Sequence, residues 1–227
     1  MHYANRIFRD RSDAGRRLGQ RLVERKLGGE IFVLGLPRGG IPVACEAAQA
    51  IGAPVDVLVV RKLGAPFNPE LALGSIASGG VTVLNPWILE QLGLDEQDLA
   101  PIAEREQREL ERREQLYRGG RTLPDLSGKV VVLVDDGAAT GATMHAGVEA
   151  VKALESKRVI VALPTCSREA ARRLEAAADE VIVLYMPDPY FAVGASYEVF
   201  DQVSDGEVTD WLARAARTAG RVAGGDA

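Results

Sequence analysis

The sequence predicts an α/β protein built on an open, mostly parallel β-sheet with helices on both faces. Apolar segments of strand length alternate with helical patterns through short connections, and this alternation is typical of such sheets. The chain has 227 residues, 47% of them hydrophobic, which is enough for one domain, spanning 1–227, with a substantial core. The expected strands span residues 31–36, 55–60, 130–134, 158–163 and 180–185.

Charge and cysteine content exclude some classes of function. Lys and Arg total 27 against 32 Asp and Glu, and the resulting charge of -5 argues against nucleic acid as the main partner. The two cysteines, Cys45 and Cys166, lie far apart, which leaves no disulfide framework or zinc spacing. The sequence starts without an apolar leader and has no long apolar run, so we expect a cytoplasmic protein with no membrane partner.

The expected helices differ in polarity. They span residues 13–27, 41–51, 95–117, 144–154, 167–178 and 205–218. Ser12 is the expected cap of the first helix. The helix over 95–117 is dense in charge and has only a thin apolar stripe, formed by Leu99, Ile102, Leu110 and Leu116. Such a stripe suits packing on the domain edge or on a second subunit, and we expect a homodimer.

Two early strands end in glycine or positive charge. The strand over 31–36 turns through Pro-Arg-Gly-Gly at 37–40 into the next helix, although a tight turn without a ligand would also favour two glycines. The strand over 55–60 ends at Arg61 and Lys62, and ligands of open α/β sheets bind beyond such carboxyl ends. A solvated basic strand end is the alternative for this pair.

Residues 64–95 are rich in Gly and Pro and contain two short strand-like pieces, at 75–77 and 81–84. Glu70 is the only carboxylate in the first half of this segment. Its side chain is either an acid/base near a bound acceptor or an ordinary surface group, and the second interpretation is favoured.

The strand over 130–134 leads into the most informative stretch of the chain. It stops at two adjacent carboxylates, Asp135 and Asp136. Small residues follow: Gly137, Ala138, Ala139, Thr140, Gly141, Ala142 and Thr143. The backbone N–H groups of such a turn, together with a helix N-terminus, can wrap a phosphate. Two acids beside the turn then fit a ligand with a phosphate at one end and sugar hydroxyls at the other.

Two other interpretations of this stretch concern helix capping and nucleotide binding. Acids that merely cap a helix in an αβ turn remain an alternative. A nucleotide P-loop is excluded, because the G-x4-G-K-[ST] spacing and its Lys are absent.

The run Asp135-Asp-Gly-Ala-Ala-Thr-Gly-Ala-Thr143 resembles the loop of type I phosphoribosyltransferases that binds 5-phosphoribosyl 1-pyrophosphate (PRPP). The chain is also similar, over nearly all of residues 7–212, to uncharacterised bacterial members of that family. The shared motifs are Leu-Pro-Arg-Gly-Gly, Val-Arg-Lys-x-Gly and Val-Asp-Asp-Gly-x-Ala-Thr-Gly. The resemblance implies the type I phosphoribosyltransferase-like fold, with a small hood and a flexible loop. It also implies Mg²⁺-dependent phosphoribosyl transfer from PRPP to a nitrogenous base, with release of pyrophosphate, as in nucleotide salvage.

The resemblance assigns a role to each of these residues. The 5-phosphate is expected in the turn from Gly137 to Thr143, with the ribose hydroxyls on the two acids. The pyrophosphate is expected near Arg38, Gly39, Gly40, Arg61 and Lys62, with Mg²⁺ held mainly by PRPP itself. The residues expected to be catalytic are Asp135, Asp136 and Lys62. Residues 64–95 form the expected mobile loop, and residues 186–200 form the hood, where Tyr190, Phe191 and Val193 contact the acceptor or pin the C-terminal segment to the core.

Two positions depart from the family members that act on hypoxanthine and guanine. Ala139 stands where those enzymes carry an Asp, and Leu163 lies near where they place a Lys. The hood segment around Phe191 and Val193 resembles a purine-binding segment of those enzymes, whereas these two positions point away from 6-oxopurines, so the acceptor stays open. A PRPP-binding sensor without catalysis and a scaffold with a vestigial site are the competing hypotheses.

Overall fold

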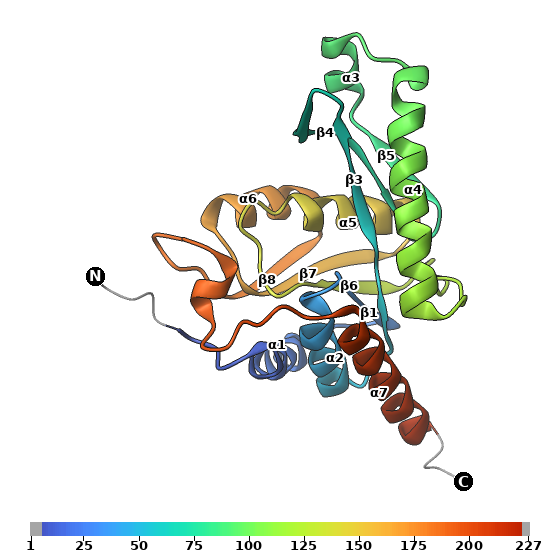
Figure 1. Cartoon of the computed structure of the whole chain (residues 1–227). Coiled ribbons are helices and arrows are strands. Elements are labelled where there is room, and N and C mark those ends of the chain that lie inside the picture. The colour runs from blue at the N-terminus through green and yellow to red at the C-terminus, as the bar shows by residue number, and fades with distance from the viewer. Residues whose placement is uncertain (1–5, 224–227) are drawn as a thin grey trace.

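Five parallel strands form the main sheet, in the order β2-β1-β6-β7-β8 (Figure 1). The structure is a computed structural model that describes residues 6–223, apart from the side chains of residues 69–70, 96 and 219–223. The strands are β1 (Ile31–Gly35), β2 (Val55–Val57), β6 (Val130–Val134), β7 (Arg158–Thr165) and β8 (Glu180–Tyr185). The predicted fold class is therefore confirmed.

Helices cover both faces of this sheet, and the sequence of β6 shows why. Val131 and Leu133 pack in one core cluster with α5 (Ala142–Ala153) and α6 (Arg168–Ala177). Val130, Val132 and Val134 point the other way, into a cluster with α1 (Arg11–Arg25) and α2 (Gly40–Ile51). Because side chains alternate along a strand, a strand covered on both faces must be apolar throughout.

A second sheet forms an arm that projects from the main sheet (Figure 1). Its antiparallel strands are β3 (Val60–Ala65), β4 (Asn68–Ala77) and β5 (Val81–Leu84), followed by α3 (Pro86–Leu92). The single strand predicted over 55–60 was wrong, because Val59 exchanges hydrogen bonds with Ser78 of the arm instead of continuing the main sheet. Most of the segment 64–95 is thus regular structure, and its mobility stays a prediction.

The polar helix α4 (Glu96–Arg118) runs along the arm. Leu99, Ile102 and Leu110 of the predicted stripe are buried, but Leu116 is exposed and Tyr117 is buried in its place. The stripe packs against β3, β4 and α7 (Asp205–Ala223) of the same chain. It therefore does not support the expected homodimer, which stays a prediction.

Other helix ends differ from the prediction by one or two residues. Asp10, not Ser12, caps α1, since its carboxylate accepts a hydrogen bond from the backbone N–H of Asp13 at 2.8 Å. Gly141 precedes α5 with φ +74, a left-handed conformation that suits glycine, and α5 begins at Ala142 rather than Met144. A short 3-10 helix, η1 (Val193–Ser196), lies in the hood segment.

Among the helices of residues 6–223, none combines the length and the apolar character needed to cross a membrane.

Candidate active site

The turn after β6 forms a small pocket of the kind that binds anions. It encloses a cavity of about 120 Å³, lined by Asp135 and by residues 137–144. Within the described part of the chain, six residues that line the cavity have a backbone N–H that donates to no protein acceptor: Gly137, Ala139, Thr140, Gly141, Thr143 and Met144. Free amides at the N-terminus of α5 are the groups that bind phosphate in other proteins. The amides on which the predicted phosphate site depends are therefore available.

The outer side of the same turn is fixed by the protein. The hydroxyl of Ser167 donates to the carbonyl of Ala139 at 2.7 Å, and Arg173 Nη1 donates to the carbonyl of Thr140 at 3.0 Å. The backbone N–H of Ala138 donates to the carbonyl of Thr165 at 3.0 Å. These bonds hold the turn in shape and leave the unpaired N–H groups of the turn available to a ligand.

The acid pair stands at the rim of this pocket. One carboxylate oxygen of Asp135 accepts the backbone N–H of Asp136 at 2.8 Å. Burial raises the pKa of Asp135 well above its usual range, and the charge of Asp136 raises it further. Burial also raises the pKa of Asp136, and the guanidinium of Arg11 opposes that rise. A ligand that donates hydroxyl hydrogens would stabilise the ionised form of this pair.

The glycine turn between β1 and α2 packs directly on the acid pair. A Cβ atom at Gly39 would lie 2.0 Å from Oδ2 of Asp136, and one at Gly40 would lie 2.8 Å from Cα of Asp135. Neither glycine has a positive φ, so close approach, not backbone freedom, requires them here. The structure thus brings together the two turns that the sequence analysis assigned to one ligand.

Gly39→Ala is expected to displace this turn and to weaken the predicted binding of PRPP by tenfold or more. No position 2.0 Å from a carboxylate oxygen can hold a methyl group, and overpacking of this kind costs about 1–3 kcal/mol of unfolding free energy. Urea unfolding and calorimetric titration with PRPP measure the two effects. The matched control is Gly28→Ala, where no atom lies within 4 Å of the added Cβ, and equal losses in both variants would contradict the assignment.

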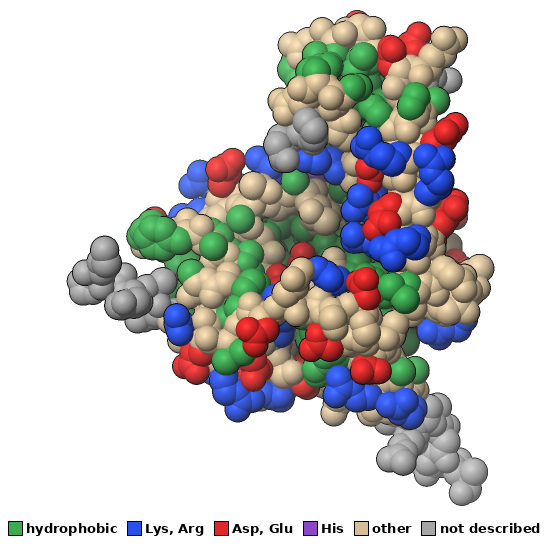
Figure 2. Space-filling model, viewed as in Figure 1, with side chains coloured by type: hydrophobic (Ala, Val, Ile, Leu, Met, Phe, Trp, Pro, Cys, Tyr) green, Lys and Arg blue, Asp and Glu red, His purple; other side chains and the backbone are tan. Residues whose placement is uncertain are grey.

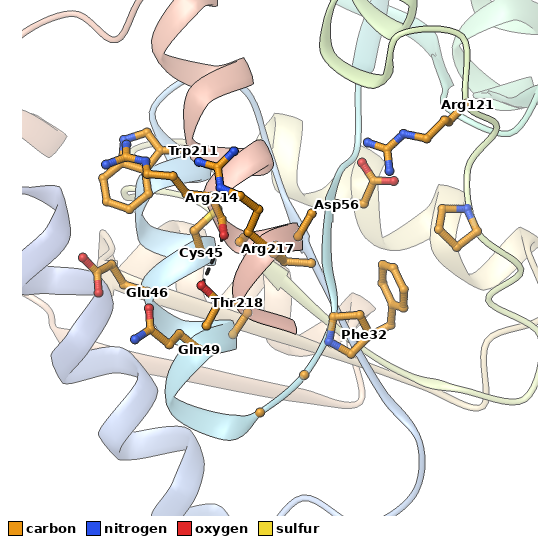
Figure 3. Close-up of a pocket in the computed structure, with 18 residues that line it drawn as sticks. Phe32, Cys45, Glu46, Gln49, Asp56, Arg121, Trp211, Arg214, Arg217 and Thr218 are labelled. Atoms are coloured by element: carbon orange, nitrogen blue, oxygen red, sulfur yellow. Dashed lines mark hydrogen bonds between the residues drawn. The ribbon is translucent and has the colours of Figure 1, made fainter. Parts of the chain in front are cut away.

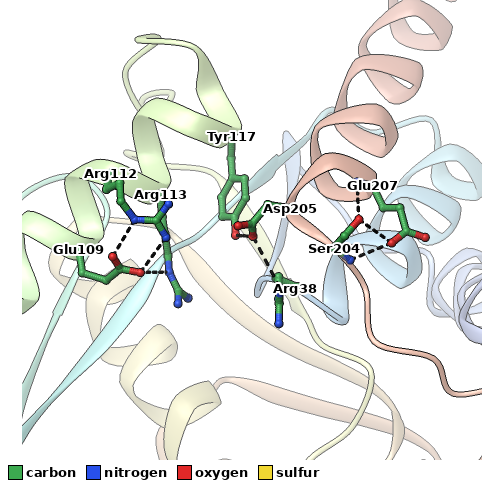
Figure 4. Close-up of polar contacts among 8 residues, drawn as sticks. All are labelled: Arg38, Glu109, Arg112, Arg113, Tyr117, Ser204, Asp205 and Glu207. Atoms are coloured by element: carbon green, nitrogen blue, oxygen red, sulfur yellow. Dashed lines mark hydrogen bonds and ion pairs between the residues drawn. The ribbon is translucent and has the colours of Figure 1, made fainter.

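Arg38 lies at the same turn but is directed towards the C-terminal helix. Its Nη1 is 4.0 Å from Oδ1 of Asp205, which also accepts the hydroxyl of Tyr117 at 2.6 Å (Figure 4). Burial and then the Asp205 bond raise the pKa of Tyr117 to about 12. The half-exposed Arg38 side chain lies beside the glycine turn, and its predicted contact with pyrophosphate stays a prediction.

Arg61 and Lys62 lie on the arm, not at the end of a core strand. Nε of Arg61 donates to Glu106 of α4 at 2.9 Å, and both side chains are largely buried. The Lys62 side chain is exposed on β3. In the space-filling view the molecule is hollowed between the arm and the main sheet, and charged side chains alternate along the α4 side of the hollow (Figure 2). The structure therefore does not unite this pair with the glycine turn, and their role at the pyrophosphate stays untested.

The three predicted acceptor residues occupy different environments. A Cβ built on Gly137 would lie 2.7 Å from Cγ1 of Val193, so Val193 packs on the phosphate turn. Phe191 is 71% exposed, so it is not pinned to the core. The hydroxyl of Tyr190 is buried close to Thr165, and burial raises its pKa to about 12.

The other positions singled out in the sequence give little to the site. Leu163 is fully buried in the sheet core, so it does not face a bound base. Ala139 is exposed on the turn. The side chain of Glu70 lies outside the described residues.

Sequence reasoning missed the residues that hold Asp136. Nε of Arg11 donates to Oδ2 of Asp136 at 2.8 Å, and the hydroxyl of Tyr197 donates to the Asp136 carbonyl at 2.6 Å. Phe200 stacks on the guanidinium of Arg11, 3.9 Å from its ring centroid. No sequence pattern separates Arg11 from the other arginines at the start of α1, so only the fold could identify it.

A larger cavity, of about 1140 Å³, lies at the opposite edge of the sheet (Figure 3). Its walls include Trp211 and Arg214 of α7, and Phe32 and Val55 near the starts of β1 and β2. The acid pair, in contrast, follows the carboxyl end of β6, where ligands of open α/β sheets bind. The larger cavity is therefore separate from the candidate site.

No group of three or more His, Cys, Asp or Glu side chains within the described residues is arranged to hold a metal ion. A bound divalent ion would need further oxygen ligands from another molecule.

The fold and this site define a class: parallel α/β proteins with an anion-binding turn and an acid pair at the carboxyl edge of the sheet. Comparison with known families makes the class specific. The sequence-family model for the phosphoribosyl transferase domain matches residues 7–199, and the chain belongs to that family. This confirms the resemblance to type I phosphoribosyltransferases.

The most similar proteins agree with this assignment. A protein provisionally named a phosphoribosyl transferase occurs in two strains of Mycobacterium tuberculosis and is 46% identical over 212 residues, which cover 93% of this chain and 48% of that protein. The chain thus spans about half the length of these curated relatives. The crystal structure of TT1426 from Thermus thermophilus is 44% identical, covers 91% of this chain and 98% of that chain, and has a TM-score of 0.83.

Proposed function

We propose that this chain is a magnesium-dependent phosphoribosyltransferase that transfers the 5-phosphoribosyl group of PRPP to a nitrogenous base and releases pyrophosphate. One observation carries the proposal: unpaired backbone N–H groups and the carboxylate of Asp135 line the same cavity. A phosphorylated sugar requires both, since its phosphate accepts hydrogen bonds and its hydroxyls donate them. Membership in the phosphoribosyltransferase family supports the same reaction.

In this proposal the 5-phosphate binds the free N–H groups between Ala139 and Thr143. The carboxylate of Asp135 accepts the ribose hydroxyls, and the turn at Arg38 and Gly39 receives the pyrophosphate. Magnesium, when bound, supplies positive charge that neutralises the leaving pyrophosphate. Because Asp136 is already paired with Arg11 and the described residues offer no metal cage, oxygens of PRPP would be the main ligands of the ion.

The reaction exchanges two bonds at carbon 1 of the ribose. The lone pair of the acceptor nitrogen forms the new bond, and the electrons of the breaking C–O bond leave with pyrophosphate. The nitrogen's proton passes to solvent, since the turn carries Ala139 and no acid at the position of the oxopurine enzymes' Asp. Positive charge develops on the ribose in the transition state. A carboxylate about 5 Å away stabilises this charge by roughly 3 kcal/mol at an effective dielectric near 20. That corresponds to a rate effect on the order of a hundredfold.

Thermal unfolding with PRPP, Mg²⁺ and a panel of bases tests this function. PRPP with Mg²⁺ is expected to raise the melting temperature, because a ligand that binds only the folded state stabilises it. Purines come first in the panel, since Phe191 of the hood segment presents an exposed aromatic face. Bases that raise the melting temperature further are then assayed for pyrophosphate release. Absence of any effect of PRPP would refute the proposal.

A PRPP-binding sensor is the second candidate. It is favoured by Ala139 and by the burial of Leu163, which leave the acceptor side with no acid or amine at the two positions used by oxopurine enzymes. The same panel separates the two functions. Stabilisation by PRPP with no pyrophosphate release on any base would favour the sensor.

A further inference from the structure

Arg11 extends from the first turn of α1 to the carboxyl edge of the sheet. Its guanidinium makes three contacts there: Nε with Oδ2 of Asp136 at 2.8 Å, Nη1 with the carbonyl of Asp201 at 2.6 Å, and its face with the ring of Phe200. Its side chain is only 12% exposed. A guanidinium group that donates hydrogen bonds from two of its edges, and whose planar face packs on an aromatic ring, is held in one position.

Asp136 is committed on the protein side. Its carboxylate is 14% exposed and pairs with Arg11, and the backbone of Gly39 closes on Oδ2 so tightly that even a methyl group is excluded. The hydroxyl of Tyr197 holds its carbonyl. The small cavity of the phosphate turn is lined by Asp135 but not by Asp136. The two neighbouring acids therefore face different surroundings.

We propose that the acid pair is divided in role: Asp135 binds the sugar hydroxyls, and Asp136 with Arg11 is a positioning unit that sets the phosphate turn against the glycine turn. This assignment rests on the proposed function, and it makes Arg11 a positioning residue that does not touch the ligand. The unit joins four segments: the end of β6, the β1–α2 turn, the start of α1 and residues 197–201.

The charges around Asp136 explain why an arginine is needed there. The groups that interact with it are Asp135 on the same strand end, Arg11 from α1, Tyr197 from the segment after η1 and Tyr190 from the hood. Of these, only Arg11 is positive, and it opposes the rise in the Asp136 pKa that burial causes. Without Arg11, Asp136 would take up a proton at a higher pH and would lose its fixed position.

A double-mutant cycle tests the division. PRPP affinity is measured by calorimetry, with Mg²⁺, for the wild type, Arg11→Met, Asp136→Asn and the double variant. Each single variant is expected to bind at least tenfold more weakly, and the double variant no more weakly than either, because both changes remove one unit. Arg16→Met on the same helix is the control, since Arg16 is half-exposed and pairs with Glu46, not with Asp136, and the variant should stay within twofold of wild type.

A pH series separates positioning from a general loss of structure. For Arg11→Met the pH below which PRPP affinity falls should shift upward, whereas the double variant, which lacks the Asp136 carboxyl and keeps only that of Asp135, should not show that shift. Arg11→Lys keeps the positive charge but loses the hydrogen bond to the Asp201 carbonyl. Its PRPP affinity should therefore lie within about fivefold of that of the wild type. If Arg11→Met does not fold, Arg11→Lys combined with Asp136→Asn completes the cycle.

Three results would overturn the inference. One is a further tenfold loss when Asp136→Asn is added to Arg11→Met, since Asp136 would then contact the ligand itself. Another is unchanged affinity and pH profile in Arg11→Met. The third is a wild type that does not bind PRPP, which refutes the proposed function as well and so is distinguishable from the first two.

Discussion

Asp135→Asn is expected to lower the rate of phosphoribosyl transfer on the order of a hundredfold while the fold is retained. The amide keeps an oxygen that can accept the backbone N–H of Asp136, but it removes the charge that would stabilise the ribose in the transition state. Pyrophosphate release under saturating PRPP measures the loss. Asp210→Asn, at an exposed carboxylate on α7, is the matched control and should retain full activity. A rate within threefold of wild type would remove Asp135 from the mechanism.

Although Asp135→Asn is expected to lower the activity, it should leave the stability of the fold at neutral pH unchanged or raise it. Burial and the Asp136 charge raise the pKa of Asp135 in the folded protein above that of an unfolded aspartate. The folded state therefore binds more protons between these two pKa values, and the stability of the wild type falls as the pH rises through that range. Asn cannot titrate, so at neutral pH Asp135→Asn should unfold at an equal or higher urea concentration than wild type. Wild type should regain stability relative to the variant as the pH is lowered.

Arg118→Met is expected to lower the free energy of unfolding by about 3–5 kcal/mol, because it leaves buried acceptors without their cation. The Arg118 side chain is 1% exposed. Its guanidinium contacts both carboxylate oxygens of Asp56 at 3.3 Å, Glu114 at 2.5 Å and the carbonyl of Val57. These contacts join the end of α4 to the point where the chain leaves the main sheet for the arm.

Equilibrium urea unfolding measures this loss. Arg108→Met on the same helix is the control, since Arg108 is 71% exposed and its pair with Glu104 spans 3.9 Å, and its effect should stay below about 1 kcal/mol. Adding Asp56→Asn to Arg118→Met should restore part of the stability, because the uncompensated buried charge is then removed. A loss in Arg118→Met no larger than that in Arg108→Met would show that the buried cluster contributes nothing.

The turn after β6 could be predicted because its signal is local. Consecutive valines, two acids and small residues determine a buried strand, its end and an open run of amides within one continuous stretch. The glycine turn at 37–40 was identified in the same way, and the order of a parallel sheet then placed both turns at one edge. The sequence did not reveal why Gly39 must be glycine, since that reason is an oxygen atom of Asp136, far along the chain.

By itself the sequence determined the alternating α/β order, the strands that are buried on both faces and the turn with its acid pair, because each depends on side-chain periodicity or on neighbours along the chain. Only the tertiary structure decided where residues 55–65 divide between two sheets, that Arg61 pairs with Glu106, and that Arg11 holds Asp136. Contacts between segments far apart in the chain leave no periodic trace in any one segment. They arise only when packing brings such side chains within hydrogen-bond distance.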